Sequence, residues 1–285
     1  MSISLRELVA WSASEVLYFR ILVSAAAIWP FILIFRRKKW KADRTYIRNL
    51  PRSDKRRLIR LTLLASLFIM ANWFTFIYAV NRISVQSAAF AYMVCPLVTT
   101  LGAYFLLKEE LSRPKKVGLI IAMVSVIMLM QGSLIEAIWS ITVALFYALY
   151  LIVQRVIKNV DKLNLLAVQI TICSLLVLPL FFMEGTQIPT STTFWWNISL
   201  IAVLFTIIPL YLSMYALNGV SASTVGILLY INPMIAFAVA IFYFKEDVTL
   251  WKLAAYSILL VAIIFFNWEF VRGFFQNKAT LPKKQ

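Results

Sequence analysis

Histidine is absent from the chain, and only two cysteines and seven glycines occur among its 285 residues. Histidine is the usual general base near neutral pH and a common metal ligand, so its absence removes most acid–base mechanisms and most metal sites. The glycines form neither of the patterns that hold nucleotide phosphates, G-x-x-x-x-G-K-[ST] and G-x-G-x-x-G. Cys95 and Cys173 lie inside apolar runs, which favours packing over a disulfide. We therefore expect no enzyme, no metal and no cofactor.

Charged residues are also scarce, at 14% of the chain, whereas 62% of the residues are hydrophobic. A soluble domain has about 25% charged and about 45–50% apolar residues. Runs of about 20 apolar residues cross a bilayer, and a helix is the open-ended structure that bonds all of its backbone polar groups in lipid. The sequence therefore predicts an all-α integral membrane protein. Nine spans are expected, near residues 15–35, 59–80, 84–107, 117–132, 134–152, 163–183, 195–217, 221–244 and 251–271.

Acidic residues are the scarcest charged class, with 12 against 28 lysines and arginines. If nine helices cross in turn, the basic connections fall on one side, and the loop 184–195 on the other side has no basic residue. Lysine and arginine mark the cytoplasmic side, so this excess predicts topology and suits anionic head groups, with no nucleic-acid partner. We expect a multi-pass protein of the bacterial plasma (inner) membrane with its C-terminus in the cytoplasm. The basic connections are 36–60, 108–116, 155–162 and the tail 272–285.

The chain repeats itself at an offset of 137 positions: residues 96–110 read PLVTTLGAYFLLKEE and residues 233–247 read PMIAFAVAIFYFKED. The aligned helices are five crossings apart, an odd number, so the two copies are expected to have opposite orientations. Inverted repeats of this kind are typical of secondary transporters. We expect two five-helix units, residues 1–132 and 133–271, of which the first lacks its N-terminal helix because the chain is truncated. Identical pairs at this offset include Tyr78/Tyr215, Asn81/Asn218, Ser84/Ser221, Pro96/Pro233 and Lys108/Lys245.

Three stretches carry a resemblance to a known family: SASEVLYFRILVS (12–24), ANWFTFIYAVNR (71–82) and YINPMIAFAVAIFYFKE (230–246). With the two inverted units, they resemble the EamA family of the drug/metabolite transporter superfamily, and within it the RarD-type permeases. The similarity extends from about residue 12 to residue 270. The resemblance implies a ten-helix permease of the plasma membrane. The missing first helix departs from the family pattern.

Candidate substrate contacts are the polar, aromatic and proline residues expected near the membrane midplane, where carriers bind solutes beside broken helices. Asn72 and Trp73 are favoured, because an amide beside a large ring offers a hydrogen bond and a stacking surface. A proline within a helix frees a carbonyl and bends the axis, so Pro96 and Pro233 are candidate hinges. The alternative is that these side chains only bond neighbouring helices. The full set is Asn72, Trp73, Tyr92, Pro96, Thr206, Pro209, Tyr211, Tyr230, Asn232 and Pro233.

Four charged residues are candidates for a vestibule or a gate. Glu15 and Arg20 are expected toward the outer end of the first span, where they line a vestibule, or where Arg20 extends to the interface or pairs across helices. Glu109 and Glu246 end spans at opposite membrane faces, where they cap helices, pair with neighbours or gate the pathway. None of the carboxylates is expected near a midplane, so the sequence indicates no proton relay.

The function that these features favour is a secondary permease, independent of ATP, for a small organic metabolite or drug-like solute. Its expected partners are the lipid bilayer and an unidentified small molecule, and the sequence leaves a homodimer open. Two alternatives are an accessory membrane protein that transports nothing and, with less support, an intramembrane enzyme. An enzyme would need a nucleophile, a base or metal ligands at one depth, and the sequence offers no such set.

Overall fold

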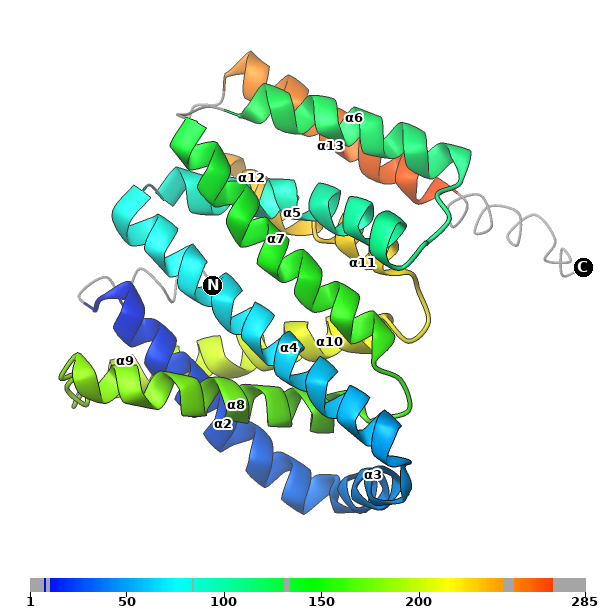
Figure 1. Ribbon diagram of the computed structural model, residues 1–285. Helices are drawn as coiled ribbons and strands as arrows, with labels where there is room; N and C mark the ends of the chain where they lie inside the picture. The colour runs from blue at the N-terminus through cyan, green and yellow to red at the C-terminus, as the bar shows by residue number, and fades with distance from the viewer. Residues whose placement is uncertain (1–7, 9–10, 84, 131–133, 243–248, 269–285) are drawn as a thin grey trace, which may run out of the picture. The chain divides into compact units, whose positions relative to one another are not determined.

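The computed structural model describes residues 8, 11–83, 85–130, 134–242 and 249–268, and every regular element in these ranges is a helix (Figure 1). This agrees with the predicted all-α fold. The α-helices are α2 (Ala13–Phe35), α3 (Arg37–Asn49), α4 (Arg52–Tyr78), α5 (Val85–Leu106), α6 (Arg113–Leu129), α7 (Leu134–Val156), α8 (Lys162–Met183), α9 (Thr192–Ala202), α10 (Ile208–Ala216), α11 (Ala222–Leu228), α12 (Ile231–Phe242) and α13 (Leu250–Phe266), and two π-helical turns are η1 (Ala79–Ile83) and η2 (Val203–Ile207).

Five of these segments are long and apolar enough to cross a membrane: α2, α4, α7, α8 and the continuous stretch Thr192–Ala216 that contains α9, η2 and α10. Shorter apolar helices lie in Phe90–Leu106, Ala222–Ile235 and Leu250–Phe266. Where the structure describes them, the nine predicted spans thus correspond to helices. Two of them are interrupted, since 195–217 contains a π-helical turn and 221–244 is divided into α11 and α12.

Helix α3 was not predicted, because the stretch 36–60 was interpreted as a connection. Residues 37–49 form a helix of their own, and α4 begins at Arg52, well before its apolar part. No residue of α3 is buried. Its helical period is carried by charged residues, so a search for apolar runs does not detect it.

The chain forms two compact units, and each combines segments from both halves of the sequence. Unit 1 consists of residues 1–82 and 149–219, and unit 2 consists of residues 83–148 and 220–285. Unit 1 therefore contains α2 to α4 and α8 to α10, and unit 2 contains α5, α6 and α11 to α13. Helix α7 runs from unit 2 into unit 1. Each unit thus packs helices of the first repeat against helices of the second.

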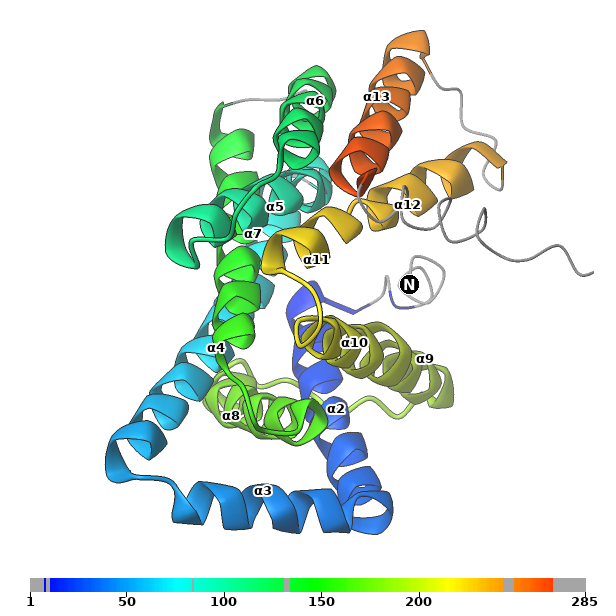
Figure 2. The ribbon, with the colours of Figure 1, turned by 90° about the vertical axis from the view of Figure 1, so that its right-hand side faces the viewer.

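In unit 2, the repeat-equivalent helices α6 and α13 lie side by side and antiparallel (Figures 1 and 2). The offset of 137 maps the two ends of α6 onto the two ends of α13. Gly118 lies against Ala262, and the Ser125 hydroxyl donates a 2.7 Å hydrogen bond to the Ala255 carbonyl. At the offset of 137, Gly118 corresponds to Ala255 and Ser125 corresponds to Ala262, so the two contacts are equivalent. This equivalence indicates a local two-fold axis between the helices.

In unit 1, the equivalent helices α2 and α8 are antiparallel as well. The guanidinium of Arg36 lies 2.7 Å from Asp161 at one end of the pair, and the Tyr18 hydroxyl donates to Glu184 at 2.9 Å at the other end. Between them, the Trp29 indole donates to the Thr171 hydroxyl at 2.8 Å. Together with the pair α6 and α13, this packing confirms the predicted inverted repeat.

The basic connection at 36–49 and the turn at 157–161 meet at one end of unit 1, through the Arg36–Asp161 ion pair. The loop at 184–191 lies at the opposite end, where Glu184 bonds Tyr18 in the second turn of α2. Within unit 1, the basic connection and the loop that has no basic residue therefore lie at opposite ends.

Candidate functional site

Among charged residues in the nine predicted spans, Arg20 lies farthest from a span end. It is the eighth residue of α2, so at 1.5 Å per residue it is about 10 Å from the helix start. Its guanidinium carbon lies 4.9 Å from the ring centroid of Trp73 on α4, and both side chains are partly buried. A cation at this distance from an aromatic face is attracted by the ring quadrupole. The geometry matches one of the two sequence hypotheses for Arg20, that it pairs across helices.

Asn72 is adjacent to Trp73 on α4 and is also partly buried. Its backbone carbonyl accepts a 3.1 Å hydrogen bond from the Thr75 hydroxyl, which also donates to the Ala71 carbonyl at 2.7 Å. The Thr75 hydroxyl thus donates within its own helix, as serine and threonine side chains often do. Unit 1 thus places the guanidinium of Arg20 on α2 against the indole of Trp73 on α4, and Asn72 is the residue before Trp73.

The second set of candidates in unit 1 lies around the π-helical turn η2. Thr206 is buried, and its hydroxyl donates to the Ile201 carbonyl at 3.0 Å. Pro209 is exposed and lies in the first turn of α10, immediately after η2. Proline cannot donate to the preceding turn, and π-helical turns are a recognised response to such an interruption. The ring of Tyr211 lies 6.0 Å from the ring of Tyr215, one turn further along α10.

In unit 2, Pro233 accounts for the break between α11 and α12. The Leu229 carbonyl would accept from residue 233 in a continuous helix, but proline has no N–H. It accepts instead from the N–H of Asn232, at 3.1 Å, and the N–H of Tyr230 bonds the Ile227 carbonyl at 3.1 Å. These bonds span three residues, so the helix tightens and is interrupted at 229–230. The sequence predicted a proline-dependent bend here, and the structure has a tightened turn that divides the α-helix into α11 and α12.

The other candidates in unit 2 have different environments. Tyr92 is 47% exposed, whereas Pro96, one turn further along α5, is buried. Tyr230 is fully buried in an apolar cluster, and among the described residues its hydroxyl has no hydrogen-bond partner. Asn232 is exposed in the first turn of α12. Unit 2 thus places its aromatic and polar candidates apart, in contrast to the contact of Arg20 with Trp73.

Two of the four charged candidates cap helices. The carboxylate of Glu15 accepts from the N–H of Ser12 at 2.8 Å and completes a capping box at the start of α2. The carboxylate of Glu109 accepts from the N–H groups of Ala222, at 2.7 Å, and Ser223, at 3.0 Å, at the start of α11. Capping is one of the roles that the sequence analysis gave for Glu109, whereas it gave no capping role for Glu15. Glu246 lies outside the described residues.

The sequence analysis missed a buried polar pair between α7 and α8. The side-chain amide of Gln154 donates to the Gln169 side chain at 2.7 Å, and both residues are almost completely buried. Lys162, at the start of α8, is buried too, and its ammonium donates to the backbone carbonyls of Gln154 and Ile157. A signal was present, because glutamine is unusual inside apolar spans and is held there by hydrogen bonds.

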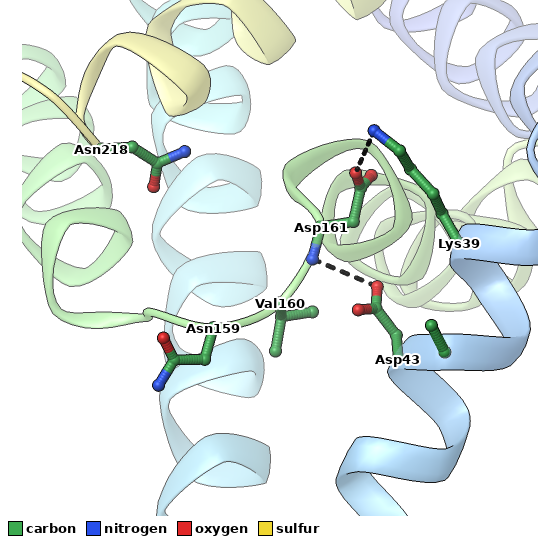
Figure 3. A pocket seen from close by; sticks show the side chains of 7 residues that line it. Lys39, Asp43, Asn159, Val160, Asp161 and Asn218 are labelled. Atoms are coloured by element: carbon green, nitrogen blue, oxygen red, sulfur yellow. Dashed lines mark hydrogen bonds and ion pairs between the residues drawn. The ribbon is translucent and has the colours of Figure 1, made fainter.

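A polar groove at one end of unit 1 was also missed. It has a volume of about 410 Å³ and lies between α3 and the turn that joins α7 to α8 (Figure 3). Figure 3 shows Lys39 and Asp43 of α3 directed toward Asp161 of the turn. None of the predicted pathway residues lines this groove. Within the part of the chain that the structure describes, no three carboxylate or thiol groups come together as metal ligands do.

Comparison with known proteins identifies the family. The model of the EamA-like transporter family matches the chain twice, over residues 3–131 and 134–268. Protein RarD of Streptomyces exfoliatus is 29% identical over 94% of this chain and 84% of its own length, and the uncharacterized transporter YojE of Bacillus subtilis is 27% identical over 92% and 89%. Protein RarD of Escherichia coli is 25% identical over 89% of this chain and 84% of its own length.

A solved crystal structure shares the fold, with a TM-score of 0.73 and 11% sequence identity over 93% of this chain and 90% of the other chain. The two family matches each cover one copy of the internal repeat, and together they cover most of the sequence. The chain is therefore a multi-pass membrane protein that belongs to the EamA-like transporter family.

Proposed function

We propose that this protein is a secondary permease of the bacterial plasma membrane, which moves a small organic metabolite or drug-like solute by alternating access between its two inverted repeats. The observation that carries the proposal is the antiparallel packing of repeat-equivalent helices, α2 with α8 and α6 with α13. Inverted repeats give secondary carriers two related states that differ in which side is open. The family and its named transporters support the same class.

The contact of Arg20 with Trp73 is the proposed centre of the solute pathway. Charge placed within a span is costly and usually serves function, and the indole face holds this guanidinium in a defined position. The neighbouring amide of Asn72 would hydrogen-bond a polar group of the solute. These three side chains offer a planar surface, a cation and a neutral hydrogen-bonding group, which together suit an organic molecule of moderate polarity.

The interruptions beside Pro209 and Pro233 are the proposed hinges. In each case the helix changes its hydrogen-bond pattern within a few residues of the proline, η2 before Pro209 and the tightened turn before Pro233. Such positions tolerate a change of backbone angles at lower cost than a continuous helix, because fewer regular bonds must be broken.

The test is solute counterflow into liposomes that contain the purified full-length chain, with labelled organic anions, zwitterions and cations and with no ATP. We expect saturable exchange for one of these classes. Trp73→Leu and Asn72→Leu should each reduce it about tenfold, the factor that corresponds to about 1.4 kcal/mol of lost interaction. Trp196→Leu is the matched control, because Trp196 lies in unit 1 and is 68% exposed.

Two outcomes would contradict the proposal. Absence of exchange for every class, from protein that unfolds cooperatively and is correctly inserted, would favour an accessory membrane protein. Exchange that Trp73→Leu and Trp196→Leu reduce equally would retain the permease but remove Trp73 from the pathway.

A further inference from the structure

Helix α3 is the most basic element in the described part of the chain. Six of its 13 residues are lysine or arginine, and Asp43 is its only acid. It lies across one end of unit 1 between the end of α2 and the start of α4 (Figure 2). One residue, Arg36, separates it from α2, and two residues separate it from α4. Since α2 is long and apolar enough to cross a membrane up to Phe35, the start of α3 is held at the membrane surface.

One face of α3 is fixed to the rest of unit 1. The ring of Trp40 packs edge-on against Trp29 of α2, with 5.1 Å between centroids. The carboxylate of Asp43 accepts from the side-chain amide of Asn164 at 2.6 Å and from the backbone N–H of Asp161 at 3.1 Å. These contacts set the rotation of α3 about its own axis, so its remaining faces point in fixed directions.

Four cations form a single row on another face of α3. Arg37, Lys41, Arg44 and Arg48 follow the spacing i, i+4, i+7 and i+11, which places them along one side of a helix. All four are exposed, and at 1.5 Å per residue the row is about 16 Å long. We call these four residues the basic row.

The charge of the basic row is not neutralised within the described residues. The ion pairs at this end of unit 1 are Arg36 with Asp161 and Lys39 with Asp161, and neither involves the row. Asp43 is directed toward the α7–α8 turn, where it is already bonded. A row of exposed cations without counter-charges creates a positive potential that attracts anions.

The lipid boundary reaches the start of α3. The last turn of α2 exposes large apolar side chains, among them Ile34, which is 69% exposed, and Phe35, which is 73% exposed. Such side chains are stable in contact with acyl chains and not with water. Arg37 follows two residues later, so the basic row begins where the hydrocarbon region ends, at the depth of the lipid head groups.

We propose that the basic row is a binding surface for anionic phospholipid head groups of the adjacent leaflet. Its start at the hydrocarbon boundary favours membrane lipid over a soluble polyanion, because the single residue between α2 and α3 holds the start of α3 at the head-group layer. Because Trp40 and Asp43 fix the helix rotation, the cations are already arranged in a row before lipid binds, which lowers the entropic cost of binding.

The test measures lipid retention by native mass spectrometry, after extraction of the full-length chain from nanodiscs of equal phosphatidylglycerol and phosphatidylcholine. Wild type should retain phosphatidylglycerol preferentially. In the variant with Arg37, Lys41, Arg44 and Arg48 all changed to glutamine, the preference for phosphatidylglycerol should decrease at least about tenfold. The reason is that each cation near an anionic surface raises the binding constant about fivefold. The control with Arg52, Lys55, Arg56 and Arg57 changed to glutamine removes the same charge from exposed positions at the start of α4 and should lose much less.

The variant Asp43→Ala distinguishes binding by a fixed row of cations from general electrostatic attraction between the basic protein and the membrane. This variant raises the net charge by one but removes the contacts that hold α3 in place. A fixed basic row predicts weaker retention of phosphatidylglycerol, whereas diffuse attraction predicts stronger retention. The proposal is wrong if the glutamine variant of the row keeps its preference, if the α4 control loses as much, if Asp43→Ala binds more tightly, or if an RNA oligonucleotide displaces the lipid from wild type.

Discussion

Gly118→Ala is the substitution for which the structure gives the most direct expectation. A Cβ atom at this position would lie 2.7 Å from the backbone nitrogen of Phe266 and 2.9 Å from the backbone carbonyl oxygen of Ala262, both on α13. Backbone atoms cannot rotate away as a side-chain end can. Helix α13 would therefore have to move away from α6 by several tenths of an ångström along their whole contact.

The expected cost follows from the rigidity of packed interiors. Added methyl groups in a well-packed core cost about 1–3 kcal/mol, and the upper part of this range applies where backbone must move. For a chain of this size, each kcal/mol lowers the unfolding temperature by about 2–4 °C, so a decrease of about 5–10 °C is expected. Gly219→Ala is the control, because a Cβ at that position would meet nothing within 4 Å.

The two cysteines allow each unit to be followed separately. Cys95 is buried in unit 2 and Cys173 is buried in unit 1, and both thiols are free. In a Cys173→Ala background, a thiol-reactive dye reports the temperature at which unit 2 exposes Cys95, and Gly118→Ala should lower it. In a Cys95→Ala background the same substitution should act less on the exposure of Cys173. An unchanged temperature for Cys95, or an equal decrease with Gly219→Ala, would refute the close contact of α6 with α13.

Two further substitutions test the interruption and the start of helices in unit 2. Pro233→Ala supplies an N–H that could donate to the Leu229 carbonyl in place of the Asn232 N–H, so α11 and α12 should join into one helix. We expect counterflow to slow severalfold, and unchanged exchange would exclude a hinge at this position. Glu109→Ala removes the acceptor of two N–H groups at the start of α11 and should cost about 1 kcal/mol, seen as a decrease of a few degrees in the Cys95 assay, whereas Glu110→Ala, at an exposed neighbour, should change little. Glu246→Ala, at the repeat-equivalent position, should act like Glu109→Ala, and a silent Glu246→Ala would show that the two repeats differ at this point.

The membrane-spanning helices could be predicted from the sequence because lipid leaves few alternatives. An apolar run of sufficient length must be helical in a bilayer, so its limits are visible in composition alone. The internal repeat could also be predicted from the sequence. The offset of 137 residues between Pro96 and Pro233 relates the first and last residues of α6 to those of α13, and neither proline lies in these helices.

Helix α3 and the partners of charged groups could not be predicted in this way. The helical period of α3 is carried by Arg37, Lys41, Arg44 and Arg48, and a periodic row of cations looks like any solvated connection when only hydropathy is considered. Glu109 was placed at a helix end from the sequence, but the N–H groups it accepts from belong to residues more than 100 positions away. Which donor a carboxylate reaches depends on the packing of separate helices, and no local pattern encodes it.

The two-fold relation between repeats explains why small residues recur between α6 and α13. The offset relates Gly118 to Ala255 and Ser125 to Ala262, and the structure brings Gly118 against Ala262 and Ser125 against Ala255. Because of the two-fold axis, the contact of Gly118 with Ala262 has an equivalent in the contact of Ser125 with Ala255. A large side chain at one contact would push the two helices apart and so disturb the other contact too. All four positions are therefore restricted to small side chains by one geometric condition. The hydroxyl of Ser125 uses the resulting close approach, because only helices this near allow it to reach a carbonyl of the neighbouring backbone.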